Sequence, residues 1–145
     1  MLVNWGTTLS DQAKTKSGGV ADKLFAQAYD KHEEVLKMKP DFYEVLNSWG
    51  GVLLYQAQSK RGSEAEVLIK QASEKCLKAD EFNPGIGSYN LACITALRGN
   101  VDECRKWFEN CLKYGTLPEK EFIEKDKDLD SVRDKKWFKE LLENL

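Results

Sequence analysis

Apolar residues recur along this chain at intervals of three or four positions, the spacing of one face of an α-helix. Near the start, Trp5, Leu9 and Ala13 follow this spacing. No stretch shows sustained alternation of apolar and polar residues, and Val, Ile and Thr are sparse. The pattern therefore predicts an all-α protein.

Glycine and proline divide the helical pattern into segments. Glycine closes helices by adopting the left-handed conformation, and proline ends them because it has no amide hydrogen to continue the hydrogen-bond ladder. The predicted helices span about 2–15, 20–38, 41–59, 63–79, 86–98, 101–113, 118–125 and 134–145. We expect the 118–125 helix to bury Phe122 and Ile123. A helical turn within 126–133 is expected to hold Leu129 and Val132.

Two helix starts carry recognisable capping patterns. Asp41 stands at the start of the third predicted helix, and aspartate is a favoured N-cap residue. Ser63 is followed three positions later by Glu66, the pattern of a capping box. We therefore expect side-chain caps at both positions.

The pattern also repeats with a period of 44 residues. Trp5-Gly6 recurs as Trp49-Gly50, Gln12-Ala13 as Gln56-Ala57, Gly18 as Gly62 and Pro40 as Pro84. A third, more diverged copy begins at Asn90-Leu91-Ala92. A fixed period of this size indicates stacked supersecondary units. Such units typically present a binding surface instead of a reaction centre.

The third copy carries a family resemblance. Its start, Tyr89-Asn90-Leu91-Ala92, and the later Gly99, Cys104, Phe108 and Cys111 fit the pattern of one helical repeat. In these positions the chain resembles the tetratricopeptide repeat (TPR) family, whose repeat is about 34 residues long. The longer period and the tryptophans Trp5 and Trp49, where the family has leucine, depart from that pattern.

The resemblance implies a single domain over 1–145, a right-handed superhelix (solenoid) of three antiparallel helix pairs with C-terminal capping helices. The repeats would span about 2–40, 41–84 and 85–115, with a cap over 116–145. A solenoid needs an atypical end unit because its last repeat would otherwise expose its inner face.

The resemblance also implies a function. Members of the family are scaffolds whose first helices line a concave groove that binds a peptide or helix of a partner protein. Carried over by register, that partner-binding groove comprises Asn4, Thr7, Asp11, Glu44, Asn47, Ser48, Gly51, Tyr55, Tyr89, Asn90 and Cys93. Glycine would admit a partner backbone closely, and tyrosine would supply rigid contact area.

An alternative reading treats the chain as a structural end unit. The second copy has a run-in over 41–46 before Trp49, whereas the first has only four residues before Trp5. We therefore favour a C-terminal piece of a longer array. Its open N-terminal face, near Trp5 and Leu9, would then support spacing or self-association.

Composition and charge narrow the partner class. The 145 residues are 41% hydrophobic and 32% charged, with a net charge of −2, so there is no basic excess to neutralise nucleic-acid phosphates. No apolar run approaches the roughly 20 residues that span a bilayer. The first ten residues lack the pattern of a signal peptide. These features favour a cytoplasmic protein that binds neither nucleic acid nor membrane.

Residues that could support catalysis are scarce. His32 is the one histidine, and it stands among Lys31, Glu33 and Glu34, so no nucleophile–histidine–acid set can be proposed around it. We expect His32 to be a packing or surface residue, and we expect neither enzymatic activity nor a cofactor.

Metal-binding patterns are weak. The four cysteines, at 76, 93, 104 and 111, occupy apolar or small-residue positions of predicted helices, which favours buried, reduced thiols. Cys104 and Cys111 share a helix face and could form a metal site with Cys93. Zinc ligands, however, are usually closer together in the sequence than these three cysteines are. Asp126, Asp128 and Asp130 start like a calcium loop, but the loop's required Gly and Glu positions hold Ser131 and Trp137. We therefore expect no metal, and we expect the three aspartates to cap helical turns.

Overall fold

The computed structural model describes residues 2–145, with side chains described from Gly6 onward, and this part of the chain is helical without any β-strand. The helices are α1 (Leu2–Lys14), α2 (Gly18–Met38), α3 (Tyr43–Ala57), α4 (Gly62–Phe82), α5 (Ser88–Leu97), α6 (Val101–Tyr114), α7 (Lys120–Lys125), the 3₁₀ helix η1 (Lys127–Val132) and α8 (Lys136–Glu143). The prediction of an all-α protein is confirmed.

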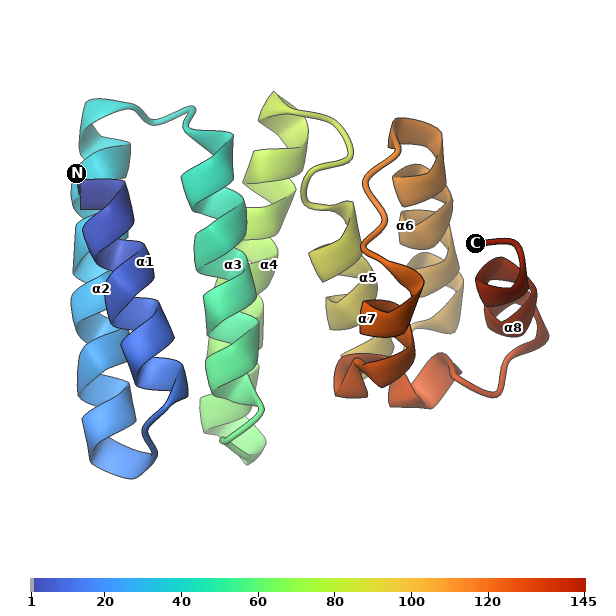
Figure 1. Cartoon of the computed structure of the whole chain (residues 1–145), viewed down its shortest axis with the longest axis horizontal. Coiled ribbons are helices and arrows are strands. Elements are labelled where there is room, and N and C mark those ends of the chain that lie inside the picture. The colour runs from blue at the N-terminus through green and yellow to red at the C-terminus, as the bar shows by residue number, and fades with distance from the viewer. Residues whose placement is uncertain (1) are drawn as a thin grey trace.

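The first six helices form three hairpins that stand side by side (Figure 1). The helices α1 and α2, α3 and α4, and α5 and α6 pack against each other within each hairpin. The contacts between hairpins run from α2 to α3, from α4 to α5 and from α3 to α5, while η1 packs against α5. The first hairpin and α8 lie at opposite ends of the row (Figure 1).

The 44-residue sequence period is reproduced in the backbone. The helices α2 and α4 are each 21 residues long. They begin at Gly18 and Gly62, which have left-handed φ values of 60° and 59°. The residues that follow them, Lys39 and Asn83, have nearly the same φ and ψ angles, −139° and 87° against −140° and 93°. The first two hairpins are therefore copies of one local structure.

The period extends to a side-chain contact. Gly6 in α1 lies against the imidazole of His32 in α2, and 44 residues later Gly50 in α3 lies against the thiol of Cys76 in α4. In both hairpins a missing side chain on the first helix makes room for a buried side chain on the second.

The main apolar core surrounds α5 and reaches α3, α4, α6 and the C-terminal helices. Phe108, Ile123 and Phe138 are among its fully buried side chains. The four cysteines are all buried, as expected, and none is paired in a disulfide in the structure. A smaller core of Ala13, Ala21, Phe25 and Val52 joins the first hairpin to α3.

The capping predictions at Asp41 and Ser63 are wrong. Phe42 directly precedes α3, and it makes no side-chain capping bond. The helix α4 already begins at Gly62, so Ser63 lies inside the first turn, where its hydroxyl cannot act as the cap. By contrast, the side chain of Asn100 accepts a hydrogen bond from the Glu103 amide at the start of α6.

The C-terminal segment was predicted in part. Ile123, Leu129 and Val132 are fully buried, as expected. Phe122 is 59% exposed, and its expected burial is wrong. Successive residues of an α-helix point about 100° apart, because 3.6 residues make a turn. When Ile123 faces the core, Phe122 must turn away from it.

Candidate functional site

An open groove of about 1110 Å³ runs along one side of the first helices. Its lining comes from α1, α3 and α5, and from the segment that contains α7 and η1. The groove residues expected from the sequence that line it are Thr7, Asp11, Asn47, Ser48, Gly51, Tyr55, Tyr89, Asn90 and Cys93. The register of the repeats thus gathers these side chains around one space.

Two of the expected groove residues remain, Asn4 and Glu44. The side chain of Asn4 lies outside the described residues, and so does that of Trp5 on the expected self-association face. Leu9, on the same face, is half-buried. Glu44 lies in the first turn of α3, before the part of that helix that faces the groove, which begins at Asn47.

The wall formed by α7 and η1 was not expected from the sequence. Phe122, Lys125, Asp126 and Asp128 line the groove from this segment. Sequence reasoning assigned the segment only to a cap. The sequence offers one signal for this wall, the adjacent apolar residues Phe122 and Ile123. A single helix cannot direct two adjacent side chains into the same core, so one of them must be exposed.

Asparagine side chains pair across the groove floor. The Asn90 Nδ2 atom in α5 donates to the Asn47 Oδ1 atom in α3 at 3.1 Å. An asparagine amide has two donor hydrogens and an oxygen with two lone pairs. This pair therefore keeps hydrogen-bonding capacity for a bound molecule. A β-carbon on the neighbouring Gly51 would meet only Asn90 Nδ2, at 3.5 Å, so the floor is open at that point.

Two aromatic side chains stand exposed along the groove. Tyr55 is 41% exposed, and the Lys14 Nζ atom lies 5.2 Å from the centre of its ring. Phe122 lies on the α7 side with its ring centre 5.9 Å from that of Tyr89. The groove therefore offers apolar contact area both beside α1 and beside α7.

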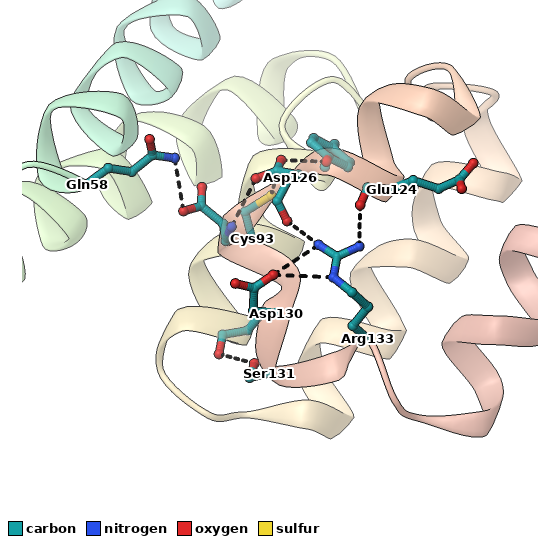
Figure 2. Close-up of polar contacts among 10 residues, drawn as sticks. Gln58, Cys93, Glu124, Asp126, Asp130, Ser131 and Arg133 are labelled. Carbon is teal, nitrogen blue, oxygen red and sulfur yellow. Dashed lines mark hydrogen bonds and ion pairs between the residues drawn. The ribbon is translucent and has the colours of Figure 1, made fainter.

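Between α5 and η1, Cys93, Asp126 and Asp128 lie together, and one potential ligand atom from each lies within 4.8 Å of the others. Figure 2 shows Cys93 beside Asp126, with the thiol Sγ atom 3.6 Å from the Asp126 Oδ2 atom. The Tyr89 hydroxyl donates to the same Oδ2 atom at 2.6 Å. The Gln58 Nε2 atom donates to Asp128 Oδ1 at 3.3 Å.

Burial controls the ionisation of this cluster. Burial and, second, the nearby Asp126 carboxylate raise the pKa of the Asp128 carboxyl to about 6. Burial, followed by the charges of the two aspartates, raises the pKa of the Cys93 thiol well above its usual value. Burial also raises the pKa of the Tyr89 hydroxyl. At neutral pH the thiol is therefore protonated and is not a nucleophile.

Arg133 holds the turn that presents the cluster. Its guanidinium donates to the carbonyl oxygens of Glu124 and Asp126 and pairs with the Asp130 carboxylate (Figure 2). Asp126 Oδ1 accepts the Asp128 amide, so Asp126 caps η1, and the capping prediction is confirmed for this one of the three aspartates.

His32 reaches the groove from α2 and is only 2% exposed. Neither of its ring nitrogens has a hydrogen-bond partner, and its ring centre lies 6.0 Å from that of Trp49. Burial lowers the pKa of the imidazole, so it is neutral at pH 7. His32 is thus a packing residue, as predicted, with no nucleophile hydrogen-bonded to it.

Comparison of the chain with protein-family models, with curated proteins and with solved structures found no significant match. In the part of the chain that the structure describes, no helix combines the length and the apolar character needed to cross a membrane. The functional argument therefore rests on the groove and on the residues that line it.

Proposed function

We propose that this protein is an interaction scaffold whose groove binds an extended peptide segment of a partner protein. The observation that carries the proposal is the open groove of about 1110 Å³, lined by the first helix of every hairpin and walled by α7 and η1. The duplicated 44-residue hairpins support the further proposal that the fold is a TPR-like superhelix.

The groove floor favours an extended segment over a helix. A helix satisfies its own backbone amides and carbonyls, whereas an extended chain needs partners for both. The side-chain amides of Asn47 and Asn90 can supply such partners from the floor. At Gly51 the absence of a side chain lets a peptide backbone approach closely.

The exposed aromatic rings supply the apolar anchors. Tyr55 and Phe122 are 41% and 59% exposed, respectively. Burying apolar area stabilises a complex by roughly 25 cal/mol per Å², and aromatic residues are enriched among the residues that dominate binding energy. A peptide that covers both rings would span the groove from α1 to α7.

The proposal is tested with a random peptide library displayed on phage. Peptides selected on the wild-type protein are synthesised, and their affinity is measured by fluorescence anisotropy for wild type, Tyr55→Ala and Tyr114→Ala. Tyr114 is the matched control, because it is 44% exposed but lies on α6, outside the groove lining. We expect Tyr55→Ala to weaken binding by about tenfold or more, and Tyr114→Ala to leave it nearly unchanged.

Circular dichroism of both variants checks that the helical content is preserved. Selected peptides that bind all three proteins equally would show that the groove is not the peptide site. A library that yields no binder to the wild-type protein would also contradict the proposal.

A further inference from the structure

We propose that Cys93, Asp126 and Asp128 bind a divalent transition-metal ion of the Zn²⁺ class at the wall of the groove. The site goes beyond peptide binding and does not depend on it. It differs from the metal patterns considered in the sequence, because it combines one cysteine of α5 with two aspartates near η1.

The donor atoms are already close enough to share one ion. One ligand atom from each residue lies within 4.8 Å of the other two. In a tetrahedral zinc site, with Zn–S about 2.3 Å and Zn–O about 2.0 Å, neighbouring sulfur and oxygen ligands lie about 3.5 Å apart. The Cys93 Sγ atom and the Asp126 Oδ2 atom are 3.6 Å apart. The Asp128 carboxylate lies within 4.8 Å of both atoms, and its approach to a shared ion would complete a three-ligand set.

The charge of the cluster also favours a cation. Asp128 is only 8% exposed. Among the described residues, the ion pairs involve neither Asp126 nor Asp128. Arg133 is near, but its guanidinium is engaged by two backbone carbonyls and by Asp130. Buried carboxylates are costly unless they are paired or coordinate a metal, and a divalent ion would neutralise the buried Asp128 together with the half-buried Asp126.

Neighbouring groups hold the ligands in place. The Tyr89 hydroxyl and the Gln58 amide donate to the carboxylates of Asp126 and Asp128, respectively. Such supporting hydrogen bonds orient metal ligands and tune affinity. The Ser131 hydroxyl donates to the Ala96 carbonyl at 2.8 Å, which ties η1 to α5 and fixes the aspartates against the cysteine.

The donor types select the class of ion. A thiolate is a soft ligand that suits Zn²⁺, whereas Ca²⁺ and Mg²⁺ prefer oxygen ligands alone. Three protein ligands leave a fourth position for water, as in open zinc sites. All three residues line the groove, so the ion has an entry path. Binding displaces the thiol proton to solvent, and affinity should therefore increase with pH.

The test uses the full chain, freed of metal with a chelator, and Zn²⁺ and Co²⁺ as the probes. Calorimetric titration with Zn²⁺ should give one ion per chain, and Co²⁺ should produce a thiolate-to-metal charge-transfer band. Asp128→Asn and Cys93→Ser should each weaken binding by at least about tenfold, because loss of a supporting partner alone costs 10- to 100-fold. Cys93→Ser should also abolish the charge-transfer band.

Asp134→Asn is the matched control, because Asp134 is an exposed acid six residues from Asp128, outside the ligand set and outside the ion pairs of the described residues. It should bind Zn²⁺ like wild type. Thermal unfolding guards against misfolding, since Zn²⁺ should raise the Tm of wild type and Asp134→Asn but not of a folded Asp128→Asn. Absence of saturable binding by wild type, or equal binding by Asp128→Asn and Asp134→Asn, would overturn the proposal.

Discussion

A β-carbon placed on Gly50 would lie 2.3 Å from the Sγ atom of Cys76, closer than atoms of two side chains can approach. It would also lie 3.2 Å from the carbonyl oxygen of Ala72. The helices α3 and α4 therefore pack with the bare backbone of one against a buried side chain of the other. This close packing of the second hairpin requires glycine at position 50.

The next residue, Gly51, provides a contrast on the same helix. Its β-carbon would meet only the end of the Asn90 side chain, at 3.5 Å. We expect Gly50→Ala to destabilise the fold by about 1–2 kcal/mol, because overpacking costs about 1–3 kcal/mol and better helix propensity returns up to about 1 kcal/mol. Gly51→Ala should stabilise the fold by roughly 0.5–1 kcal/mol.

Urea unfolding followed by circular dichroism measures both changes. Because the two variants carry the same chemical change one residue apart, helix propensity cancels in their comparison. Equal effects on the free energy of unfolding would show that the Gly50–Cys76 contact does not limit the packing of α3 on α4.

The hairpins were predictable because their signals are local and repeated. The apolar spacing, the glycines at 18 and 62 and the prolines at 40 and 84 lie within or next to the helices that they delimit. The glycine and the proline of the first copy recur 44 positions later at the equivalent helix boundaries, which supports the predicted boundaries. The groove-lining residues of the first helices followed from the same register.

The rest of the site depends on contacts between distant parts of the chain. Cys93 and Asp126 are 33 residues apart, and no spacing pattern connects them. Their meeting depends on the packing of η1 against α5, which is set by the buried Leu129 and Val132. The exposure of Phe122 likewise follows from which of two adjacent apolar residues, Phe122 or Ile123, enters the core. Both residues are apolar, and the sequence does not indicate which of the two side chains is buried.

Asp80 organises the connection from α4 to α5, and its loss should weaken the fold. Its Oδ1 atom accepts hydrogen bonds from the amides of Gly85 and Gly87, at 3.0 and 3.1 Å, and from the Ser88 hydroxyl, at 3.0 Å. We expect Asp80→Ala to reduce the free energy of unfolding by about 2–3 kcal/mol, because hydrogen bonds to a charged group contribute about 1.5–3 kcal/mol and the freed donors lose their acceptor.

Glu81→Ala is the control for Asp80, because Glu81 is the exposed neighbour on the same helix. It should change stability by less than about 0.5 kcal/mol. Asp80→Asn keeps an acceptor oxygen, so its stability should lie between those of Asp80→Ala and wild type. An Asp80→Ala variant as stable as Glu81→Ala would show that the connection does not need the carboxylate.

His32 should make the fold sensitive to acid. Burial lowers the pKa of its imidazole below 6.5 in the folded protein, so the unfolded chain takes up the proton first as the pH falls. Its contribution to stability is therefore complete above about pH 6.5 and declines below it, by up to about 1.4 kcal/mol per pH unit, until the folded-state pKa is reached.

Urea unfolding of wild type and His32→Leu at pH 7.5 and 5.5 tests this dependence. The variant removes the titrating group and the two unpartnered ring nitrogens, so the loss between the two pH values should be smaller than in wild type. The comparison cancels other groups that titrate in this range, including the Asp128 carboxyl, whose pKa is raised to about 6. Equal pH dependence in both proteins would exclude His32 as the cause.

The cysteines of the core should be unreactive until the protein opens. Burial raises the pKa of the Cys76 thiol to about 12 and of the Cys104 and Cys111 thiols to about 11. At pH 8 about one thiol in a thousand or fewer would then be the reactive thiolate, even if a reagent could enter. Since all three side chains are 0% exposed, alkylation requires unfolding.

Pulsed iodoacetamide labelling, read for each cysteine by mass spectrometry, distinguishes local from global opening. Cys76 lies in α4, whereas Cys104 and Cys111 lie in α6, so the three thiols report on two hairpins. These hairpins share one core around α5, and we therefore expect all three thiols to be labelled at the same rate, with the same dependence on urea. Faster labelling of Cys104 and Cys111 than of Cys76 would show that the third hairpin opens on its own, and the groove wall that packs on α5 would then open with it.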